Sequence, residues 1–324
     1  MSNKKPQLLD GMALRQWRLK VKAFRRRGKV FYLESNRGAK ALHITASEEE
    51  SKRRLSAVEH LARGGFTSLP RPILNRFGDS CSRAFNGYYS ISDWIEGRPL
   101  RLGEANEAVL AARSLASLHT ASQGFMPRGE PFFRLPARET ASAMLAYRNM
   151  SLAGPRWREG LSFVYAQAAA VLRLLTPATE QKLKQRVSQE GGICLSADLS
   201  KALRIDEEGH VFALDFGEWQ PGPGAVDVAE LLLHCGEQGA WRSAASCSAL
   251  EEYLLLRPLP DEERDLLLAA LILPYEPLML LRGFGGGQFD MGELETRWQA
   301  ACGYEKSKMT WIEGLAPLLY RGKR

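Results

Sequence analysis

Two aspartates near the middle of the chain flank a pattern that could hold their carboxylates close together. The apolar segments 203–205 and 211–214 enclose a turn at 206–209 and predict a β-hairpin. Asp198 precedes the first strand and Asp215 directly follows the second, so both carboxylates would stand at one end of the hairpin. Phosphoryl transfer uses such a pair, because one carboxylate receives the proton of the attacking hydroxyl while the other holds Mg²⁺ against the nucleotide phosphates. In an arbitrary protein, aspartates at these places would serve as turn or cap residues, and that alternative stays open.

The residues before position 100 predict a small antiparallel sheet with one helix. Apolar residues alternate from Trp17 to Phe24, which is the period of a half-buried strand, and 26–28 then predicts a turn. Ser47 with Glu50 three residues later is a capping-box pattern, and the helical spacing of the apolar residues after it predicts a helix over 47–64. The expected strands of this part are 17–24, 30–35, 39–45, 72–77 and 88–94.

The residues after position 100 show helical spacing instead, interrupted by the β-rich segment 193–216. The sequence therefore predicts an α+β fold in two parts. A sheet-rich part covers 1–96, and a mostly helical part covers 97–324 and carries the hairpin at 194–219. The expected helices of the second part are 104–120, 139–149, 157–175, 179–190, 225–235, 240–256, 261–281 and 294–301.

The segment 194–219 resembles the catalytic hairpin of aminoglycoside phosphotransferases, choline kinases and their spore-coat relatives. Those proteins carry HGDxxxxN around the first strand and DF or DW after the second. Here SAD at 196–198 stands at the HGD position, Leu203 stands at the asparagine, and ALDF at 213–216 matches the second motif. LASLH at 115–119 resembles the family's LAxLH helix. DVA at 227–229 resembles its DLA helix start, whose aspartate braces the catalytic loop. The sequence itself favours the alternative, in which Asp227 is an N-cap ahead of the following helix.

Two further segments resemble the CotS-type spore-coat branch of this family. WIEGRPL at 94–100 is similar to its hinge motif, and the stretch 261–281 is similar to its C-terminal helix with a proline inside the pattern. The resemblance implies a bilobal, protein kinase-like fold with a nucleotide site. It implies synthesis in the cytoplasm, placement in the spore coat, and other coat proteins as partners.

The same resemblance assigns roles to individual residues. It implies Asp198 as the catalytic base and Asp215 as the metal ligand, with ATP and Mg²⁺ as cofactors if the site is functional and none if it is not. On the nucleotide side it implies His43 at the lysine position and Glu59 as its partner on the helix. Two more residues are assigned to this side, namely Glu96 in the hinge segment and Lys201 as a relocated lysine.

Three positions depart from the family pattern. His43 replaces the nucleotide-binding lysine of the third strand, and a short, mostly neutral histidine cannot supply that charge; the nearby Lys40 would point to the other face. Leu203 offers no oxygen in place of the asparagine, and Ser196 replaces the histidine under the loop. One missing electrostatic clamp costs about 3–4 kcal/mol of transition-state stabilisation, so these changes favour a pseudokinase with a structural or scaffolding role. The alternative is an active, atypical phosphotransferase acting on a small hydroxylated molecule or a coat protein.

Composition and charge add a third hypothesis. The chain has 324 residues and a net charge of +7, and eight of its cations fall between Arg15 and Lys29 without an acid among them. This cluster predicts either a solvated strand pair or a surface that binds a polyanion; nucleic acid is not expected, because no nucleic-acid motif accompanies it. The sequence shows no long apolar run, no secretory signal and no paired cysteine spacing, so neither a membrane partner nor a disulfide framework is expected.

Overall fold

The computed structural model describes residues 9–28, 30–126, 141, 155–195, 199–214, 219–285, 287–288 and 290–320. The chain divides into two compact units. The sheet unit comprises Met1–Arg98 and Ala202–Trp219, and the helical unit comprises Pro99–Lys201 and Gln220–Arg324. A sheet with one long helix in the first unit and a mostly helical second unit confirm the expected α+β class.

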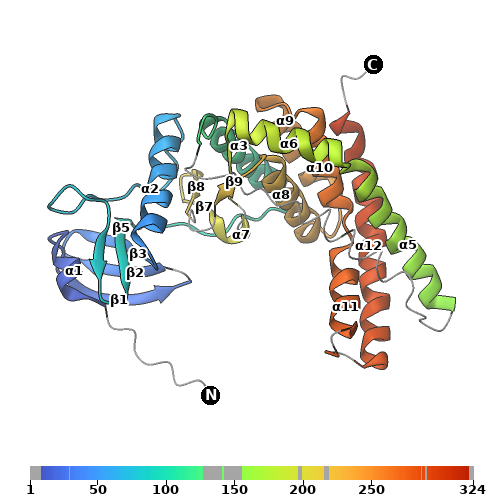
Figure 1. The fold of residues 1–324 in the computed structure, drawn as a ribbon, viewed down its shortest axis with the longest axis horizontal. Coiled ribbons are helices and arrows are strands. Elements are labelled where there is room, and N and C mark those ends of the chain that lie inside the picture. The colour runs from blue at the N-terminus through green and yellow to red at the C-terminus, as the bar shows by residue number, and fades with distance from the viewer. Residues whose placement is uncertain are drawn as a thin grey trace. The chain divides into compact units, whose positions relative to one another are not determined.

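The sheet unit is built on five antiparallel strands in the order β1-β2-β3-β5-β4 (Figure 1). One face of this sheet is covered by a core cluster that includes Trp17, Phe31, Leu33, Leu42 and Tyr89. The described elements of the unit are α1 Gly11–Arg15, β1 Val21–Arg27, β2 Val30–Ser35, β3 Gly38–Thr45, α2 Glu48–Arg63, β4 Ser82–Ala84, β5 Gly87–Asp93, β7 Leu203–Ile205 and β8 Val211–Ala213.

The first strand differs from its expected bounds at both ends. The alternation from residue 17 correctly predicted that Trp17 and Leu19 are buried, but the strand begins only at Val21. Arg18 between them adopts a positive φ of 56°, which a continuous strand does not allow. At the other end Arg26 and Arg27 continue the strand, so of the expected turn at 26–28 only Gly28 lies in a turn. The expected strand at 72–77 is reduced to a bridge between Pro72 and Ser92.

The capping pattern at the start of α2 is confirmed. Ser47 is the N-cap, and its hydroxyl accepts a hydrogen bond from Glu50 N at 3.1 Å. The carboxylate of Glu50 reaches back to Ala46 N at 3.1 Å, so two otherwise unpaired donors at the helix start are satisfied. This fixes where α2 begins relative to β3, which ends two residues before Ser47.

The hairpin β7–β8 belongs with the sheet unit by its contacts, whereas the sequence predicts that 194–219 belongs to the C-terminal part. Arg98 N donates to Ile205 O at 3.0 Å, and Ile205 N donates to Arg98 O at 2.9 Å. Ala213 N donates to Ser68 O at 2.9 Å on the other side of the hairpin. These main-chain bonds join strands far along the sequence to the first hundred residues, and local sequence patterns carry no information about them.

The helical unit packs its helices around one another, with α3 against α8 and α9, and α10 against α5 and α8 (Figure 1). The helix expected at 139–149 lies outside the described residues, except for residue 141. The described elements are α3 Ala105–Ala121, α5 Pro155–Leu174, α6 Pro177–Glu190, β6 Ile193–Cys194, α7 Leu199–Ala202, β9 Gln220–Pro221, α8 Ala225–Gln238, α9 Ser243–Leu256, α10 Asp261–Ile272, α11 Tyr275–Gly285 and α12 Met291–Leu319.

The single helix expected over 261–281 is two helices, α10 and α11, separated at Leu273 and Pro274. Proline lacks an amide hydrogen and restricts the residue before it, so the helix ends there. The carbonyls freed by this break find buried donors. Gln167 Nε2 donates to Ile272 O at 3.3 Å, and Lys308 Nζ of α12 donates to Leu273 O at 2.8 Å.

The buried ammonium at this break is balanced by a carboxylate one turn earlier on α12. Lys308 Nζ lies 2.7 Å from the Glu305 carboxylate, and both side chains are at least 95% removed from solvent. Burial raises the pKa of Glu305 and lowers that of Lys308, and their attraction opposes both shifts. The broken helix therefore depends on α12, because α12 carries the cation that caps it.

Among the described residues, no single helix has both the length and the apolar composition to cross a membrane. Two bent pairs, Glu159–Leu174 with Pro177–Glu190 and Asp261–Ile272 with Tyr275–Gly285, meet that test only when each pair is taken together.

Candidate functional site

Strand β3 presents His43 on the sheet face opposite the core. Leu42 is fully buried in the core cluster, and side chains alternate along a strand, so its neighbour His43 points the other way. Lys40 shares the face of Leu42 and forms a 2.6 Å ion pair with Asp93, its partner in the register of β3 and β5. As the strand alternation predicts, Lys40 does not stand beside His43.

The imidazole of His43 is bonded to an arginine. Arg54 Nη2 on α2 lies 2.9 Å from His43 Nε2. A guanidinium only donates hydrogen bonds, so Nε2 accepts and the ring is neutral with its proton on Nδ1. Desolvation of the imidazole, and then the positive charge of Arg54, hold the pKa of His43 well below its ordinary value. At the position where the family pattern places a lysine, the side chain therefore carries no charge.

Glu59, the helix acid implied as the partner of this position, makes a different contact. Its carboxylate pairs with Arg63 at 3.1 Å on the exposed side of α2. Arg54 lies four residues before Val58 and seven before Leu61, so it shares the buried stripe of the helix. The helical spacing of Arg54 is visible in the sequence. The family pattern predicts an acid on this helix, so it does not single out an arginine.

Glu96 is exposed in the segment that follows β5. This segment is held tightly to β7. A Cβ on Gly97 would lie 3.0 Å from Ile205 O, the same oxygen that accepts from Arg98 N. This close approach of two backbones favours glycine at position 97. The hinge motif thus fixes the course of the chain at Glu96, and a contact of Glu96 with nucleotide stays a prediction.

The structure describes only part of the hairpin that the sequence predicts to be catalytic. Leu203 is buried at 1% exposure in β7, opposite Ala213 in the register, so the asparagine position is part of the core. Lys201 is exposed in the short helix α7. Ser196, Asp198 and Asp215 lie outside the described residues, and their proposed roles stay predictions.

The buried carboxylate of Asp227 holds the chain just before that undescribed segment. Its two oxygens accept from Leu195 N at 3.1 and 2.8 Å, and Oδ2 lies 3.0 Å from His119 Nε2. One turn later on α8, Glu230 Oε1 accepts from Leu199 N at 3.4 Å. Residues three apart on a helix share a face, so α8 holds the chain on either side of 196–198. This is the bracing contact that the resemblance implies for Asp227.

Asp227 does not cap its helix. The N-cap of α8 is Gly224, and Asp227 is the third helical residue, so the alternative N-cap role is wrong. The reason lies in packing: a Cβ on Gly224 would come within 2.6 Å of His119 Nδ1. The close approach of α3 therefore requires glycine at the cap position, and the aspartate side chain turns inward instead.

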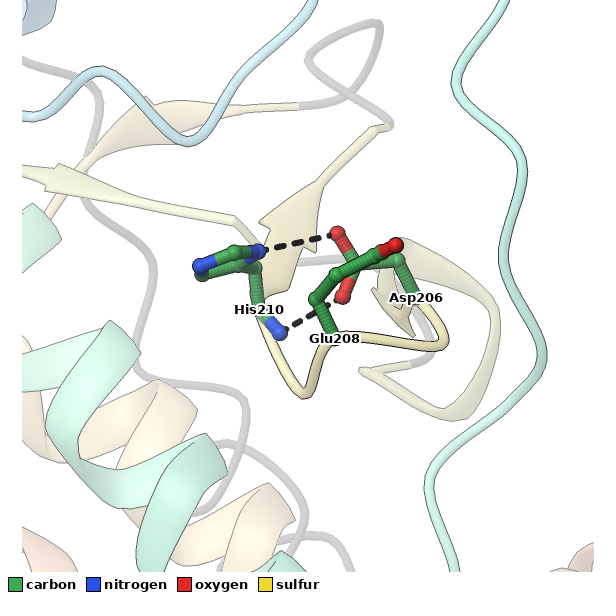
Figure 2. Close-up of side chains that lie close together, drawn as sticks. All are labelled: Asp206, Glu208 and His210. Carbon is green, nitrogen blue, oxygen red and sulfur yellow. Dashed lines mark hydrogen bonds and ion pairs between the residues drawn. The ribbon is translucent and has the colours of Figure 1, made fainter.

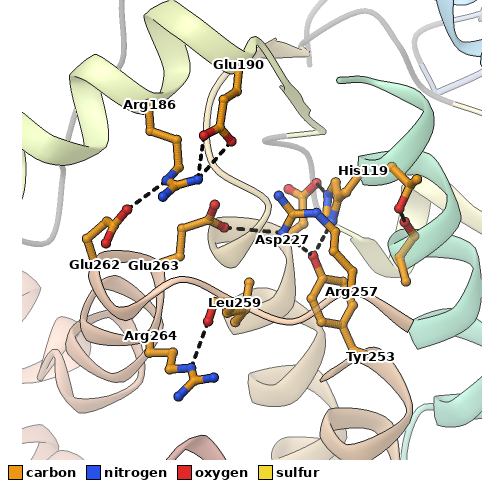
Figure 3. A network of polar contacts seen from close by, with 12 residues as sticks. His119, Arg186, Glu190, Asp227, Tyr253, Arg257, Leu259, Glu262, Glu263 and Arg264 are labelled. Carbon is orange, nitrogen blue, oxygen red and sulfur yellow. Dashed lines mark hydrogen bonds and ion pairs between the residues drawn. The ribbon is translucent and has the colours of Figure 1, made fainter. Parts of the chain in front are cut away.

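A chain of buried polar groups extends from Asp227 through His119 (Figure 3). Tyr253 Oη lies 2.8 Å from His119 Nδ1, and Arg257 Nη1 donates to the same hydroxyl at 3.1 Å. Because arginine must donate, the hydroxyl proton points to His119 Nδ1, and His119 Nε2–H donates to Asp227. Burial raises the pKa of Tyr253, which keeps the hydroxyl protonated. His119 thus forms a polar link between α3, α8 and α9.

This network borders a small cavity within the helical unit. Its volume is about 20 Å³, and its lining includes His119, Arg257 and Glu263 together with Arg186 of α6. A cavity of that size has room for about one water molecule. Arg186 is already held by Glu262 at 2.7 Å and by Glu190 at 2.7 Å (Figure 3). The cavity is therefore too small to serve as an acceptor-substrate pocket.

A second cluster of ionisable side chains lies in the turn between β7 and β8 (Figure 2). Donor atoms of Asp206, Glu208 and His210 all lie within 4.8 Å of one another. Asp206 accepts from His210 N at 2.7 Å and contacts His210 Nδ1 at 3.1 Å. These are the local bonds of an aspartate that closes a hairpin turn, and they account for the cluster without a metal ion.

Comparison with solved structures identifies the fold. An aminoglycoside phosphotransferase from Alicyclobacillus acidocaldarius matches with a TM-score of 0.81 at 18% identity, covering 98% of each chain. Amicoumacin kinase hAmiN, solved with AMP-PNP and Ca²⁺, matches with a TM-score of 0.51 at 15% identity over 88% of each chain. Choline kinase from Cryptosporidium parvum matches with a TM-score of 0.51 at 14% identity over 94% of this chain and 93% of its own.

No protein-family model matches the sequence. The chain has the kinase-like fold shared by aminoglycoside phosphotransferases and choline kinases, as its sequence pattern predicted. At these identities the likeness establishes the fold alone.

Substitution of Asp227 tests the bracing contact. Asp227→Ala should lower the free energy of unfolding by about 3–5 kcal/mol, because it leaves His119 and Leu195 N buried without their acceptor. Urea unfolding measures the loss, and hydrogen exchange should show faster exchange at the Leu195 amide. Glu295→Ala, on the exposed side of α12, is the control. A loss below about 1 kcal/mol, in the range of surface substitutions, would contradict this role.

The neutral state of His43 predicts a pH dependence. Below about pH 6.5 the unfolded chain binds a proton at residue 43 that the folded chain does not bind, so acidification lowers the free energy of unfolding. Relative to His43→Gln, which keeps an acceptor for Arg54, the wild-type protein should lose up to about 1.4 kcal/mol per pH unit between about pH 6.5 and 5. Urea unfolding across this range measures the difference. His60→Gln, on the same helix, is the control. Parallel pH profiles for the wild type and His43→Gln would refute the assignment.

Proposed function

We propose that this protein is a kinase-like pseudoenzyme with a structural or scaffolding role and weak or absent nucleotide binding. The observation that carries the proposal is the contact between His43 and Arg54. In the family pattern a lysine on the third strand pairs with a helix acid and contacts the nucleotide phosphates. Here a neutral histidine accepts from an arginine, so the pair has neither the free ammonium nor the acid.

The described residues do not fit ATP and Mg²⁺ in the way that the fold family implies. Binding of a nucleotide triphosphate depends on cations that neutralise its phosphates, and His43 supplies none. The asparagine position is occupied by Leu203, whose apolar side chain is buried and cannot coordinate a metal. Arg54 is cationic, but one end of its guanidinium is engaged by the imidazole. No catalytic step is therefore assigned to this site.

An active, atypical phosphotransferase is the second candidate function. It is favoured by the bonds from Asp227 and Glu230, which hold the chain on both sides of 196–198 and would position Asp198 as a base. Several proteins of the same fold are described as kinases or phosphotransferases, one of them solved with a nucleotide analogue and Ca²⁺. In this reading Asp215 would bind the metal, Lys201 would replace the missing lysine, and the acceptor would be a small hydroxylated molecule or a coat protein.

Nucleotide titration separates the two candidates. If the wild type had a nucleotide site, ATP and Mg²⁺ at about 100 times the Kd of that site would stabilise the folded protein by about 2.7 kcal/mol. We expect instead that ATP and Mg²⁺ raise the Tm of the wild type little or not at all. The double variant His43→Lys/Arg54→Glu places a lysine and an acid at the two contacting positions and should gain a nucleotide-dependent rise in Tm. His60→Lys/Arg63→Glu makes the same exchanges elsewhere on α2 and should not. ATP-dependent phosphate transfer by the wild type that Asp198→Asn abolishes would establish the active enzyme instead.

The proposed place of action is the spore coat, with other coat proteins as partners. Support comes from the resemblance of 94–100 and 261–281 to CotS-type proteins, although the second segment is broken at Pro274. In the organism that makes this protein, fractionation of purified spores should recover the chain with the coat layers. Recovery from vegetative cells in equal amount and from no spore fraction would exclude this placement.

A further inference from the structure

The outer edge of strand β1 is an open border of the sheet. Strand β1 pairs with β2 on one side, and in the described part of the chain no strand pairs with its other side (Figure 1). From Lys22 to Arg27 every residue of β1 is exposed. An edge strand presents a row of main-chain N–H and C=O groups that another extended chain can pair with, unless the edge is covered or blocked.

The charge of this edge is positive throughout. Strand β1 carries Lys22, Arg25, Arg26 and Arg27, and the sequence has no acidic residue from position 11 to position 33. Within the described chain no carboxylate pairs with Lys22, Arg25 or Arg27. Some basic residues elsewhere in the same unit are paired, as Lys40 is with Asp93. Lys22, Arg25 and Arg27 are therefore cations without a carboxylate partner in the described chain, beside the open main chain.

The cations lie on both faces of the strand. Arg25 stands over the ring of Tyr32 at 4.6 Å, its partner in the register, on one face of the sheet. Phe24 packs against Phe31, with ring centroids 6.3 Å apart, on the other face. By alternation Arg27 shares the face of Arg25, and Arg26 shares the face of Phe24. An extended chain added at this edge would place its own side chains alternately beside these two rows.

We propose that the outer edge of β1 binds an extended acidic segment of a partner protein, which adds a sixth strand to the sheet. The partner's backbone pairs with the open edge, and its carboxylates pair with exposed cations of the strand such as Arg25 and Arg27. This inference is independent of whether the protein binds nucleotide.

Other occupants fit the same edge less well. A second copy of β1 would bring arginine opposite arginine, which disfavours pairing between copies. The first eight residues of the chain carry Lys4 and Lys5 and no acidic side chain, so they do not supply the missing charge. A nucleic acid could neutralise the cations, but its backbone offers no matching row of donors and acceptors for the main chain of β1. An acidic peptide satisfies both requirements.

The test uses the full chain and a fluorescein-labelled peptide of eight residues in which glutamates occur on both faces of an extended strand, separated by valines. Fluorescence anisotropy should show saturable binding that weakens as salt rises from about 50 to 200 mM. The same peptide with alternate backbone nitrogens methylated keeps its charge but loses donors for strand pairing, and it should bind at least about tenfold more weakly. Equal binding of both peptides would overturn strand addition and leave only charge attraction.

Variants of the protein locate the binding surface. Arg25→Glu/Arg27→Glu, at exposed positions, should weaken peptide binding by about tenfold or more while leaving the thermal unfolding temperature unchanged. The matched control Arg71→Glu/Arg83→Glu makes the same change in net charge within the sheet unit, with Arg83 on the opposite edge strand β4, and should bind like the wild type. Equal losses in both variants would overturn the assignment to β1. Saturable binding of single-stranded DNA without binding of the acidic peptide would show a nucleic-acid surface and refute the proposal.

Discussion

The carboxylate of Asp227 is a charge removed from water, and the surrounding part of the helical unit compensates for that removal. A buried carboxylate is costly unless donors surround it, and here the donors are an amide hydrogen of the chain at Leu195 and the ring of His119. His119 is fixed in turn by Tyr253, and Gly224 leaves room for it. The position of the chain that enters the candidate catalytic segment thus follows from one electrostatic requirement met by three helices.

The sheet unit handles charge in the opposite way. The guanidinium of Arg54 on α2 is buried against the sheet. The residue beside it, His43, accepts its hydrogen bond, where a lysine could only donate. A lysine at position 43 would stand next to that guanidinium and be repelled by it. The residues at 43 and 54 are therefore linked, because the histidine accepts the hydrogen bond that the arginine donates. A lysine at 43 with an acid at 54 would require both residues to change.

Local patterns in the sequence predicted those parts of the fold that local physics decides. Strand β2, strand β3, the cap of α2 at Ser47 and the paired strands β7 and β8 all follow from alternation, capping or turn residues close in sequence. The patterns failed at one unusual backbone conformation and at contacts that distant residues decide. Arg18 interrupts the strand pattern through its own backbone conformation, and the association of β7 with Arg98 depends on bonds across more than a hundred positions.

The candidate site shows the same division. The motifs around Asp227 and His119 were recognisable, and the bracing contact follows from them, but the N-cap alternative ignored the space that α3 takes beside Gly224. Arg54 was missed because the family pattern directs attention to an acid, although its place in the buried stripe of α2 was visible. The aspartates at 198 and 215 remain predictions from sequence.

The break between α10 and α11 has a consequence for the timing of folding. Its freed carbonyl at Leu273 is received by Lys308, a residue 35 positions later in the chain. While the protein is being synthesised, this carbonyl leaves the ribosome well before the ammonium that will cap it. Water must serve as its partner during that interval, so the packing around Pro274 can be completed only after α12 has emerged and docked with Glu305 alongside.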